Sequence, residues 1–544
     1  MNAVSDVLKR GAWMRNLPAQ IDGYGSVRPF TGAFDNLGQI ERAAVRLTSA
    51  APGRPKVLGS IAAAIEACGL TDGGVISFHH HLRDGDSVMA MVVAEIARAG
   101  IRDITIAPSS LFPVHAPLVP HLESGVIGGI HTAYMVGPVA EAVSRGMLKR
   151  PVIMCTHGGR ARAIQSGALR IDVAFVAAPT ADTYGNINGV DGKAACGVLG
   201  YAAADVESAR YVVAITDNLV PYPACPIDIT QDHVDFVVAV DSIGDPRGIA
   251  SGTTRPTTDP VGLQIANTAA AVIAASGLLE DGFSFQTGAG GISLAVAAAL
   301  KNVMHERKVR GSFASGGITG VIVDMFHEGL FRSLFDVQCF DLAAVDSYRR
   351  DEAHLGMTAS MYANPHNRGA VVNQLDVMIL GAAEIDVDFN VNVTTGTDGI
   401  IMGGSGGHAD AAAGAKLAIV TTRLNAGGYA KVVDRVTTVT TPGETIDVLV
   451  TEAGVAVNPR REELRERLVA GGVPVVSIDD LRVRAARGAS RQPARGASRH
   501  PERGASRQPA RGASRHPERG VDGRPVAVVE YRDGTVIDVV SAVA

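Results

Sequence analysis

The sequence predicts an α/β protein made of two tandem, diverged copies of one unit with largely parallel sheets. Three observations favour this fold class. Short apolar strands alternate with helical segments, which is typical of parallel sheets. The same strand–loop–helix–strand order occurs twice along the chain. The chain has 544 residues, and a single hydrophobic core rarely grows beyond about 250–300 residues.

The first copy is expected within residues 51–275. An apolar strand at 74–78 is followed by a polar, turn-rich loop at 79–86. Residues 87–100 have helical periodicity and end at a glycine, which predicts a helix and its stop signal. Residues 101–110 then read as the next strand.

The second copy is expected within residues 276–544. A strand is predicted at 281–285, a glycine-rich loop at 286–291 and a helix at 292–308. A longer match joins residues 169–192 to residues 373–396 in one ungapped register, which favours duplication. The identical pairs, each 204 positions apart, include Asp172 and Asp376, Ala178 and Ala382, Asp182 and Asp386, Asn186 and Asn390, and Asn188 and Asn392.

Two segments do not fit the repeated unit. Residues 1–50 have few periodic segments and are expected to form an N-terminal arm. Residues 487–519 repeat the octad RGASR(Q/H)P(A/E), and each proline would cost a helix about 3 kcal/mol. We therefore expect a disordered insertion that interrupts the second domain, the alternative being a basic tether for an acidic partner. A hairpin predicted at 526–540 then completes that domain.

Composition excludes several classes of function. Hydrophobic residues make up 46% and charged residues 19%, as in globular proteins. The net charge of −5 shows no basic excess, so no nucleic-acid partner is expected. No apolar stretch reaches the roughly 20 residues that a membrane span needs. The five scattered cysteines and the absence of an apolar leader predict a reducing, cytoplasmic location, and no metal site is expected.

Basic residues mark two loops of the first copy. His79, His80, His81 and Arg83 occupy one, and Arg160 and Arg162 lie in another that also carries glycines. Side chains alternate along an extended chain, so His79 and His81 are expected to share a face. Because Arg binds carboxylates through two parallel hydrogen bonds, these residues favour a small polyanionic substrate. A metal site at the histidines and a surface salt bridge for Arg162 are the alternatives.

Glycines mark two loops of the second copy. The loop containing Gly288, Gly290 and Gly291 opens a helix, where backbone N–H groups could bind a phosphate or an oxyanion. The alternative is a plain tight turn. The second glycine-rich loop precedes another helix and would suit close approach of a nucleotide or pantetheine chain. The alternative for this loop is a flexible linker. Its candidate binding residues are Gly403, Gly404, Gly406, Gly407, His408 and Asp410.

Several motifs resemble the citrate lyase α-subunit family of the CoA-transferase superfamily, over nearly the whole chain. They include ISFHHHLRDGD, THGGRARAI, SFQTGAGGISLAVA, SFASGGITGVIVDMFHEGLF and GGSGGHAD. The resemblance implies two CoA-transferase-type (NagB/RpiA-like) domains. It also implies exchange of acetyl for citryl on the thioester of an acyl carrier protein: acetyl-carrier plus citrate gives citryl-carrier plus acetate. A β (lyase) subunit and a γ (acyl carrier) subunit are then the expected partners in a hetero-oligomer.

The resemblance also implies which residues act. No cofactor would be tightly bound; the thioester would belong to a CoA-like group on the carrier, or to CoA. Many CoA-transferases carry a nucleophilic Glu where Gly316 stands here, after Ser315. Without that carboxylate, citrate would attack the thioester directly, with Ser315 and Gly316 lining the vacated space. Asn392 and Asp410 match two further segments of the superfamily and are expected near the carrier's arm.

Other functions stay open on the sequence alone. A related CoA-transferase could use free acyl-CoA and another carboxylate, such as citramalate. A non-catalytic sensor of sugar phosphates or nucleotides on the same fold would carry an added regulatory domain, which the sequence does not show. A sugar-phosphate isomerase would need only one such unit.

Overall fold

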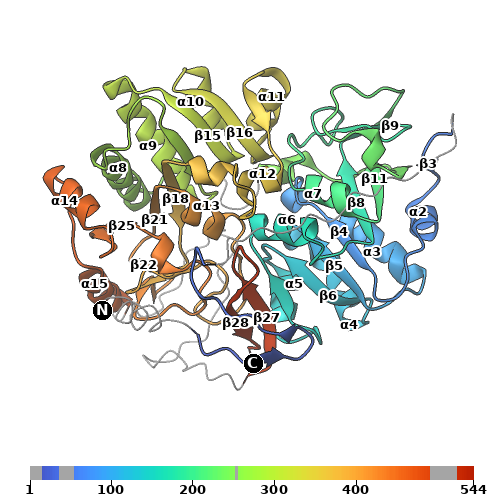
Figure 1. Ribbon diagram of the computed structural model, residues 1–544, viewed down its shortest axis with the longest axis horizontal. Coiled ribbons are helices and arrows are strands. Elements are labelled where there is room, and N and C mark those ends of the chain that lie inside the picture. Colours follow the sequence, from blue (N-terminus) through green and yellow to red (C-terminus); the bar gives the residue numbers. More distant parts are fainter. Residues whose placement is uncertain (1–14, 36–53, 251–254, 490–522, 544) are drawn as a thin grey trace.

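The computed structural model describes residues 15–35, 54–250, 255–489 and 523–543. Two α/β halves lie side by side, with the first half on the right and the second on the left of Figure 1. Each half is built around one large sheet, of ten strands in the first and eight in the second. The predicted fold class is confirmed. No helix among the described residues is long and apolar enough to cross a membrane.

The first half surrounds a sheet whose central strands are buried on both faces. For example, every residue of β8 (Val173–Ala178) is buried, as expected for a parallel strand covered by helices. The sheet order is β28 (Val536–Ser541), β27 (Pro525–Glu530), β7 (Val152–Met154), β6 (Ile127–Thr132), β5 (Ile104–Pro108), β4 (Val75–Phe78), β8, β11 (Tyr211–Thr216), β13 (Phe236–Ala239) and β3 (Val57–Leu58). Its helices are α2 (Ile61–Cys68), α3 (Val88–Arg98), α4 (Val119–Glu123), α5 (Pro138–Ser144), α6 (His157–Gln165) and α7 (Ala203–Ser208).

The second half repeats this arrangement. Its sheet order is β17 (His354–Gly356), β16 (Phe331–Cys339), β15 (Gly311–Ile318), β14 (Ser284–Thr287), β18 (Val377–Gly381), β21 (Leu417–Thr421), β25 (Val448–Thr451) and β26 (Gly454–Val457). Its helices are α8 (Pro260–Ala275), α9 (Gly291–Arg307), α10 (Gly320–His327), α11 (Leu342–Arg350), α12 (Ala359–Ala363), α13 (His408–Gly414), α14 (Glu462–Ala470) and α15 (Ile478–Ala489). The predicted helices at 87–100 and 292–308 are α3 and α9.

The duplication inferred from the sequence is visible in both topology and hydrogen bonding. The order β7-β6-β5-β4-β8-β11-β13 of one sheet matches β17-β16-β15-β14-β18-β21-β25 of the other. The Asp172 carboxylate accepts the N–H of Val75 at 2.8 Å, and the Asp376 carboxylate accepts that of Ser284 at the same distance. Each matched aspartate therefore joins two adjacent strands of its own half.

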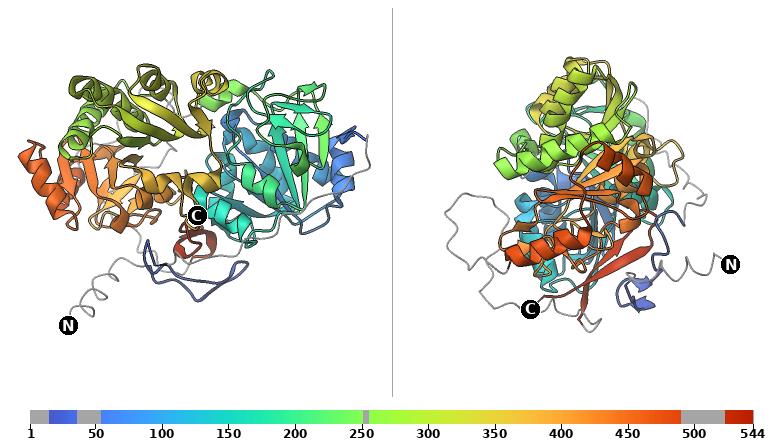
Figure 2. Two further views of the ribbon diagram at one scale, coloured as in Figure 1. Left: turned by 45° about the horizontal axis from the view of Figure 1, so that its top comes forward. Right: turned by 90° about the vertical axis from the view of Figure 1, so that its left-hand side faces the viewer.

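The C-terminal hairpin lies where the sequence did not place it. β27 pairs with β7, so β27 and β28 extend the sheet of the first half, although the expectation was that they complete the second domain. The open edge of β7 supplies backbone hydrogen-bonding groups that no local sequence signal reveals. The described part of the arm packs on the hairpin, where Ile21 contacts Val528 and Val536 in a small buried cluster. Figure 2 shows both segments below the two halves.

The octad repeat lies mostly outside the described residues. Residues 487–489 form the end of α15, and residues 490–519 are not described. The parts of the arm at 1–14 and 36–50 also lie outside the described residues.

Candidate active site at the seam between the halves

The basic loops of the first half lie against the second half, and we call this region of contact between the halves the seam. These loops follow the carboxyl ends of parallel strands, which is where ligand sites of α/β sheets form. Gln338, at the end of β16, donates a hydrogen bond of 2.7 Å from Nε2 to the backbone oxygen of His80. α6 of the first half and α12 of the second also lie next to each other at the centre of Figure 1.

The histidine triplet follows β4 and is buried. The rings of His79 and His81 lie 4.3 Å apart and their Nδ1 atoms are in contact, which confirms that the two side chains share a face. His80 points elsewhere and stacks on Tyr201, at 4.6 Å between ring centres, and on His157, at 5.4 Å. His81 Nε2 accepts the backbone N–H of Tyr201 at 3.2 Å.

Burial keeps these imidazoles neutral. It lowers the pKa of His79 to about 4 and, with the nearby guanidinium of Arg160, the pKa of His157 to about 3. The pKa values of His80 and His81 lie well below the usual range for the same reason. The histidines therefore offer hydrogen bonds at neutral pH, and any positive charge for an anionic substrate comes from arginine.

Arg83 is the arginine best placed to supply that charge. Its guanidinium carbon lies 5.1 Å from the ring centre of Phe112 and 4.9 Å from that of Phe340, so one aromatic ring of each half contacts the cation. Among the described residues, no carboxylate lies within ion-pair distance of Arg83, and its buried Nε has no hydrogen-bond partner. Its backbone has φ of 50°, a left-handed conformation that costs roughly 1–3 kcal/mol outside glycine.

The other two predicted arginines are buried against other parts of the protein. Arg160 forms two hydrogen bonds to the Asp205 carboxylate, at 2.8 and 2.9 Å, and a third to the backbone oxygen of Ala107. Arg162 is buried against the C-terminal hairpin, where burial raises the pKa of Glu530 and the charge of Arg162 opposes that shift. Among the described residues Arg162 also has no ion-pair partner, but of the three only Arg83 lies beside an aromatic ring of each half, which makes it the strongest candidate for binding the substrate.

Asp410 fixes the start of α6 from the other side of the seam. Its carboxylate accepts the Thr156 hydroxyl at 2.9 Å and the Gly158 N–H at 2.8 Å. Thr156 in turn caps the helix by accepting the Gly159 N–H at 2.8 Å. Burial raises the pKa of Asp410 to about 6, although the nearby Arg532 opposes the shift. Asp410 thus positions His157, which is the first residue of the helix.

The glycine run before α13 packs against the first half. Gly406 donates its N–H to Ala133 at 3.0 Å and accepts the His157 N–H at 2.8 Å, while Gly403 accepts the Met135 N–H at 3.2 Å. Side chains at Gly404 and Gly407 would collide with Ala133 and Tyr362 respectively. The backbone that approaches these glycines closely therefore belongs to the protein itself, whereas the sequence suggested a ligand chain.

Two further residues were predicted to lie near the pantetheine-like arm of the carrier, and both hold loops of the second half in place. His408 contacts the Thr441 hydroxyl at 2.8 Å and the Gly381 backbone oxygen at 2.9 Å. Asn392 is fully buried, accepts two backbone N–H groups and donates to the Glu384 carboxylate at 3.0 Å. Both side chains position backbone beside the seam.

The loop before α9 keeps backbone donors, but not all of the predicted ones. The Gly288 N–H donates to the Ile379 backbone oxygen at 2.8 Å, so this glycine cannot serve as an oxyanion donor. Gly290 precedes the first helical residue, Gly291, and the first N–H groups of a helix have no acceptor within it. A side chain at Gly290 would meet only Ser293 Oγ, at 3.6 Å, which leaves room above the loop.

Gln286 fills the space beside Gly316. The Ser315 hydroxyl donates to Gln286 Oε1 at 3.0 Å, and Gln286 Nε2 donates to the Tyr362 hydroxyl at 2.7 Å. Gly316 has φ of 102°, and an added Cβ would lie 2.7 Å from Gln286 Cδ. A carboxylate side chain at this position would therefore meet both strained backbone and an occupied space.

Sequence reasoning missed the aromatic residues of the seam. Phe112, Tyr201 and Phe340 are isolated in the sequence and carry no motif. It is the order of the strands that brings them to the basic loops.

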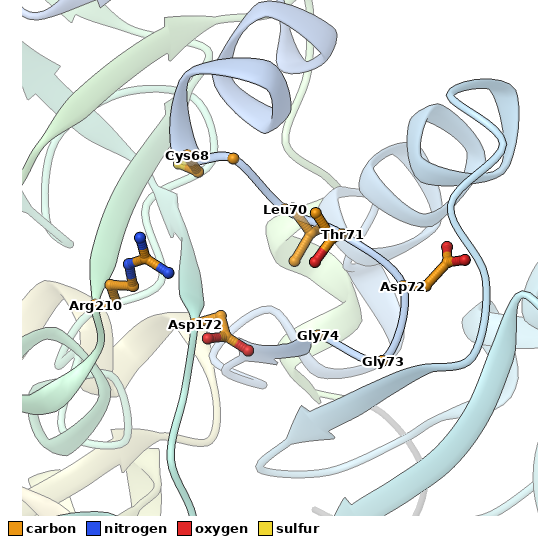
Figure 3. Close-up of a pocket in the computed structure, with 9 residues that line it drawn as sticks. Cys68, Leu70, Thr71, Asp72, Gly73, Gly74, Asp172 and Arg210 are labelled. Carbon is orange, nitrogen blue, oxygen red and sulfur yellow. The ribbon is translucent and has the colours of Figure 1, made fainter.

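A separate surface depression, lined by Gly74, Asp172 and Arg210 among others, lies at the amino ends of the strands of the first sheet (Figure 3). It is at the opposite edge from the loops described above, so it does not belong to this site.

Comparison with known proteins identifies one family for the chain. The family profile "Citrate lyase, alpha subunit (CitF)" matches residues 54–495. The citrate lyase alpha chain of Escherichia coli (strain K12) is 47% identical over 488 residues, covering 90% of this chain and 91% of the relative. That of Klebsiella pneumoniae is 44% identical over 489 residues, covering 90% and 91%.

Solved structures show the same likeness. A citrate lyase alpha subunit from Streptococcus mutans, solved in complex with citrate, aligns with a TM-score of 0.88 and 44% identity over 97% of this chain and 99% of that one. A malonate decarboxylase alpha subunit from Acinetobacter baumannii aligns with a TM-score of 0.61 at 16% identity, over 80% and 88%, which shows a shared fold.

Proposed function

The chain belongs to the citrate lyase α-subunit family, and we propose that it is a citrate CoA-transferase that binds citrate at the seam between its halves. The reaction exchanges acetyl for citryl on a thioester: acetyl-carrier plus citrate gives citryl-carrier plus acetate. The chain works within a multi-subunit citrate lyase complex, in which a β subunit cleaves the citryl thioester and a γ subunit carries it.

One observation carries the assignment of the site. Arg83 presents a guanidinium without an ion-pair partner between Phe112 and Phe340, at the place where the two halves meet. The two aromatic rings shield the guanidinium from water, and its N–H donors have no carboxylate partner among the described residues. A carboxylate accepts two such donors side by side. The neutral His80 and His157 beside it add hydrogen-bonding groups without adding charge.

The chemistry follows from the absence of a carboxylate at Gly316. A citrate carboxylate oxygen attacks the acetyl carbonyl carbon, the C–S bond breaks, and a mixed citryl–acetyl anhydride and a thiolate result. The thiolate then attacks the citryl carbonyl, and acetate leaves with the oxygen that citrate contributed. The protein supplies position and electrostatic stabilisation rather than a nucleophile.

The backbone donors at the start of α9 suit the oxyanion of these steps. The N–H groups of Gly290 and Gly291 lie at the positive end of the helix, and the open space beside Gly290 fits a thioester carbonyl. The pantetheine-like arm of the carrier then enters on the side of the second half. Free CoA is the alternative donor of the thioester, and the two are separated by comparing acetyl-carrier with acetyl-CoA.

Oxygen tracing in a single turnover tests the direct route. With citrate labelled by ¹⁸O in its carboxylates and enzyme in excess over acetyl-carrier, direct attack delivers the label to acetate in the first turnover. A covalent carboxylate route would instead release acetate with an oxygen from the enzyme, so unlabelled acetate would refute direct attack. Borohydride treatment during turnover gives a second readout, because a reduced glutamate in the chain would mark the covalent route.

Substrate exchange tests the identity of the acid. Replacing citrate by citramalate in the acetate-release assay should reduce kcat/KM, because one carboxylate is missing. A preference for citramalate would favour the related CoA-transferase. A chain that binds citrate without releasing acetate from either donor would favour a non-catalytic sensor.

A further inference from the structure

Three side chains of types that commonly bind metals form a cluster in the second half. They are separate from the residues that we propose to bind citrate. Asp336, Cys339 and His354 are all buried and come from β16 and the start of β17. One ligand atom from each lies within 4.8 Å of the other two. Because zinc binds sulfur at about 2.3 Å and nitrogen or oxygen at about 2.0–2.2 Å, one ion can reach all three atoms.

The hydrogen bonds around His354 fix which nitrogen faces the cluster. Ser347 donates its only hydroxyl hydrogen to the Asp351 carboxylate at 2.7 Å. The contact of 2.9 Å between Ser347 Oγ and His354 Nδ1 must then use a hydrogen on Nδ1. With its hydrogen on Nδ1, the His354 ring turns Nε2, the nitrogen that could bind a metal, toward Asp336 Oδ2, which is 3.2 Å away. A metal-binding histidine is typically oriented by such a hydrogen bond from its other nitrogen.

The cluster has too few hydrogens for its acceptors. Asp336 Oδ1 already accepts the Gln338 N–H at 2.8 Å, and Oδ2 faces both His354 Nε2 and the Cys339 sulfur, the latter at 3.1 Å. Only the thiol hydrogen is available for these three atoms. Facing lone pairs in a buried position are unfavourable unless a positive charge lies between them.

We propose that Asp336, Cys339 and His354 bind a first-row divalent cation, with zinc as the best match to their chemistry. A thiolate, an imidazole and a carboxylate together favour zinc, whereas magnesium and calcium prefer oxygen ligands alone. In the sequence, Asp-x-x-Cys is followed by His fifteen residues after the Cys, and this spacing is not that of a zinc-binding motif. Pairing of β16 with β17, which puts Leu334 opposite His354, brings the histidine to the other two ligands.

The ion would stabilise the seam rather than take part in the acyl exchange. Gln338 lies between two of the ligands and donates to the His80 backbone oxygen. Gly197 of the first half lies so close to the Cys339 sulfur that any side chain there would collide with it. An ion that holds the end of β16 in place therefore also holds this strand against two loops of the first half.

Metal content of the full-length chain tests the proposal directly. After dialysis against a weak chelator, the wild-type chain should retain about one zinc per chain, whereas Cys339→Ser and His354→Gln should lose it. Cys68→Ser is the matched control, since Cys68 is also buried but lies outside the cluster, and it should retain the metal. Zinc at the same level in Cys339→Ser as in wild type, or no zinc in any chain, would overturn the proposal.

Cobalt gives a test that needs no variant. Co²⁺ added to the metal-stripped wild-type chain should produce a thiolate-to-cobalt charge-transfer band and tetrahedral d–d bands, and should raise the melting temperature. Mg²⁺ at the same concentration should do neither. Co²⁺ binding without a thiolate band would show that Cys339 is not a ligand and would overturn the proposal.

Discussion

Arg83 of the first half and Phe340 of the second are in contact across the seam, with the guanidinium carbon 4.9 Å from the centre of the ring. Phe112 contacts the same cation at 5.1 Å. A charge beside two aromatic rings is partly shielded from water, which strengthens its interaction with an anion. The relationship also means that neither half alone forms the complete site that we propose for the anion.

Replacing Arg83 should weaken citrate binding. Arg83→Lys keeps the charge but loses the planar pair of donors, and a charge-assisted hydrogen bond contributes about 1.5–3 kcal/mol. We therefore expect the KM for citrate to rise by roughly 10- to 100-fold, measured by acetate release. Arg98→Lys, at an exposed position on α3, is the control and should leave the KM unchanged. An unchanged KM in Arg83→Lys would remove Arg83 from the site.

A side chain at Gly316 should disturb both folding and catalysis. Gly316→Ala places a Cβ on left-handed backbone and 2.7 Å from Gln286 Cδ. Gly69→Ala is a matched control, because Gly69 has φ of 61° but open space around it. We expect Gly69→Ala to lower the free energy of unfolding by about 1 kcal/mol and Gly316→Ala to lower it further. Urea denaturation measures both, and equal losses would show that Gln286 moves aside freely.

Asp410 should make stability depend on pH. Burial raises its pKa in the folded protein to about 6, from 3.8 in the unfolded chain. The folded state therefore binds the proton more tightly, and the contribution of Asp410 to stability is greatest below about pH 4 and is lost as the pH rises to about 6. At about 1.4 kcal/mol per pKa unit, this loss is on the order of 3 kcal/mol.

The variant Asp410→Asn isolates this effect. The difference in unfolding free energy, wild type minus variant, should fall between about pH 4 and pH 6 and then level off. Denaturation curves at four pH values are sufficient to measure it. Parallel pH dependence in the two proteins would mean that Asp410 keeps an ordinary pKa.

The duplicated aspartates should have related but unequal effects. Asp172→Ala leaves the Val75 N–H without its acceptor. Asp376→Ala does the same to the Ser284 N–H and also removes a contact with the Ser284 hydroxyl, which keeps the Gln374 backbone oxygen as its acceptor. An unsatisfied buried donor costs about 1–3 kcal/mol. Both variants should lower the melting temperature, Asp376→Ala by more. The reverse order would mean that the extra hydroxyl contact contributes nothing to stability.

The fold could be predicted because its signals are local. Alternation of strands and helices, two glycine-rich strand–helix turns and five identical pairs in one register sufficed for two parallel-sheet units. The shared face of His79 and His81 also followed, because it depends only on the alternation of side chains along two residues.

The site could be predicted only in part, because its decisive contacts are long-range. The sequence identified Arg83, Arg160 and Arg162 as equivalent candidates, and only the pairing of Arg160 with Asp205 and the burial of Arg162 against the hairpin separated them. The glycines at 403–407 were noticed, but the close contacts that the structure shows for them are with the protein itself, and their role in binding the carrier's arm stays a prediction.

The sequence by itself determined the repeated α/β unit, the basic and glycine-rich loops and the family resemblance, since each depends on residues that are near neighbours in the chain. Only the tertiary structure decided that the C-terminal hairpin joins the first sheet, that Arg83 lies between rings from both halves, and that Asp336, Cys339 and His354 converge. The physical reason is the same in each case: these contacts depend on which strand edges pair and which loops meet at the seam, and no local pattern specifies that.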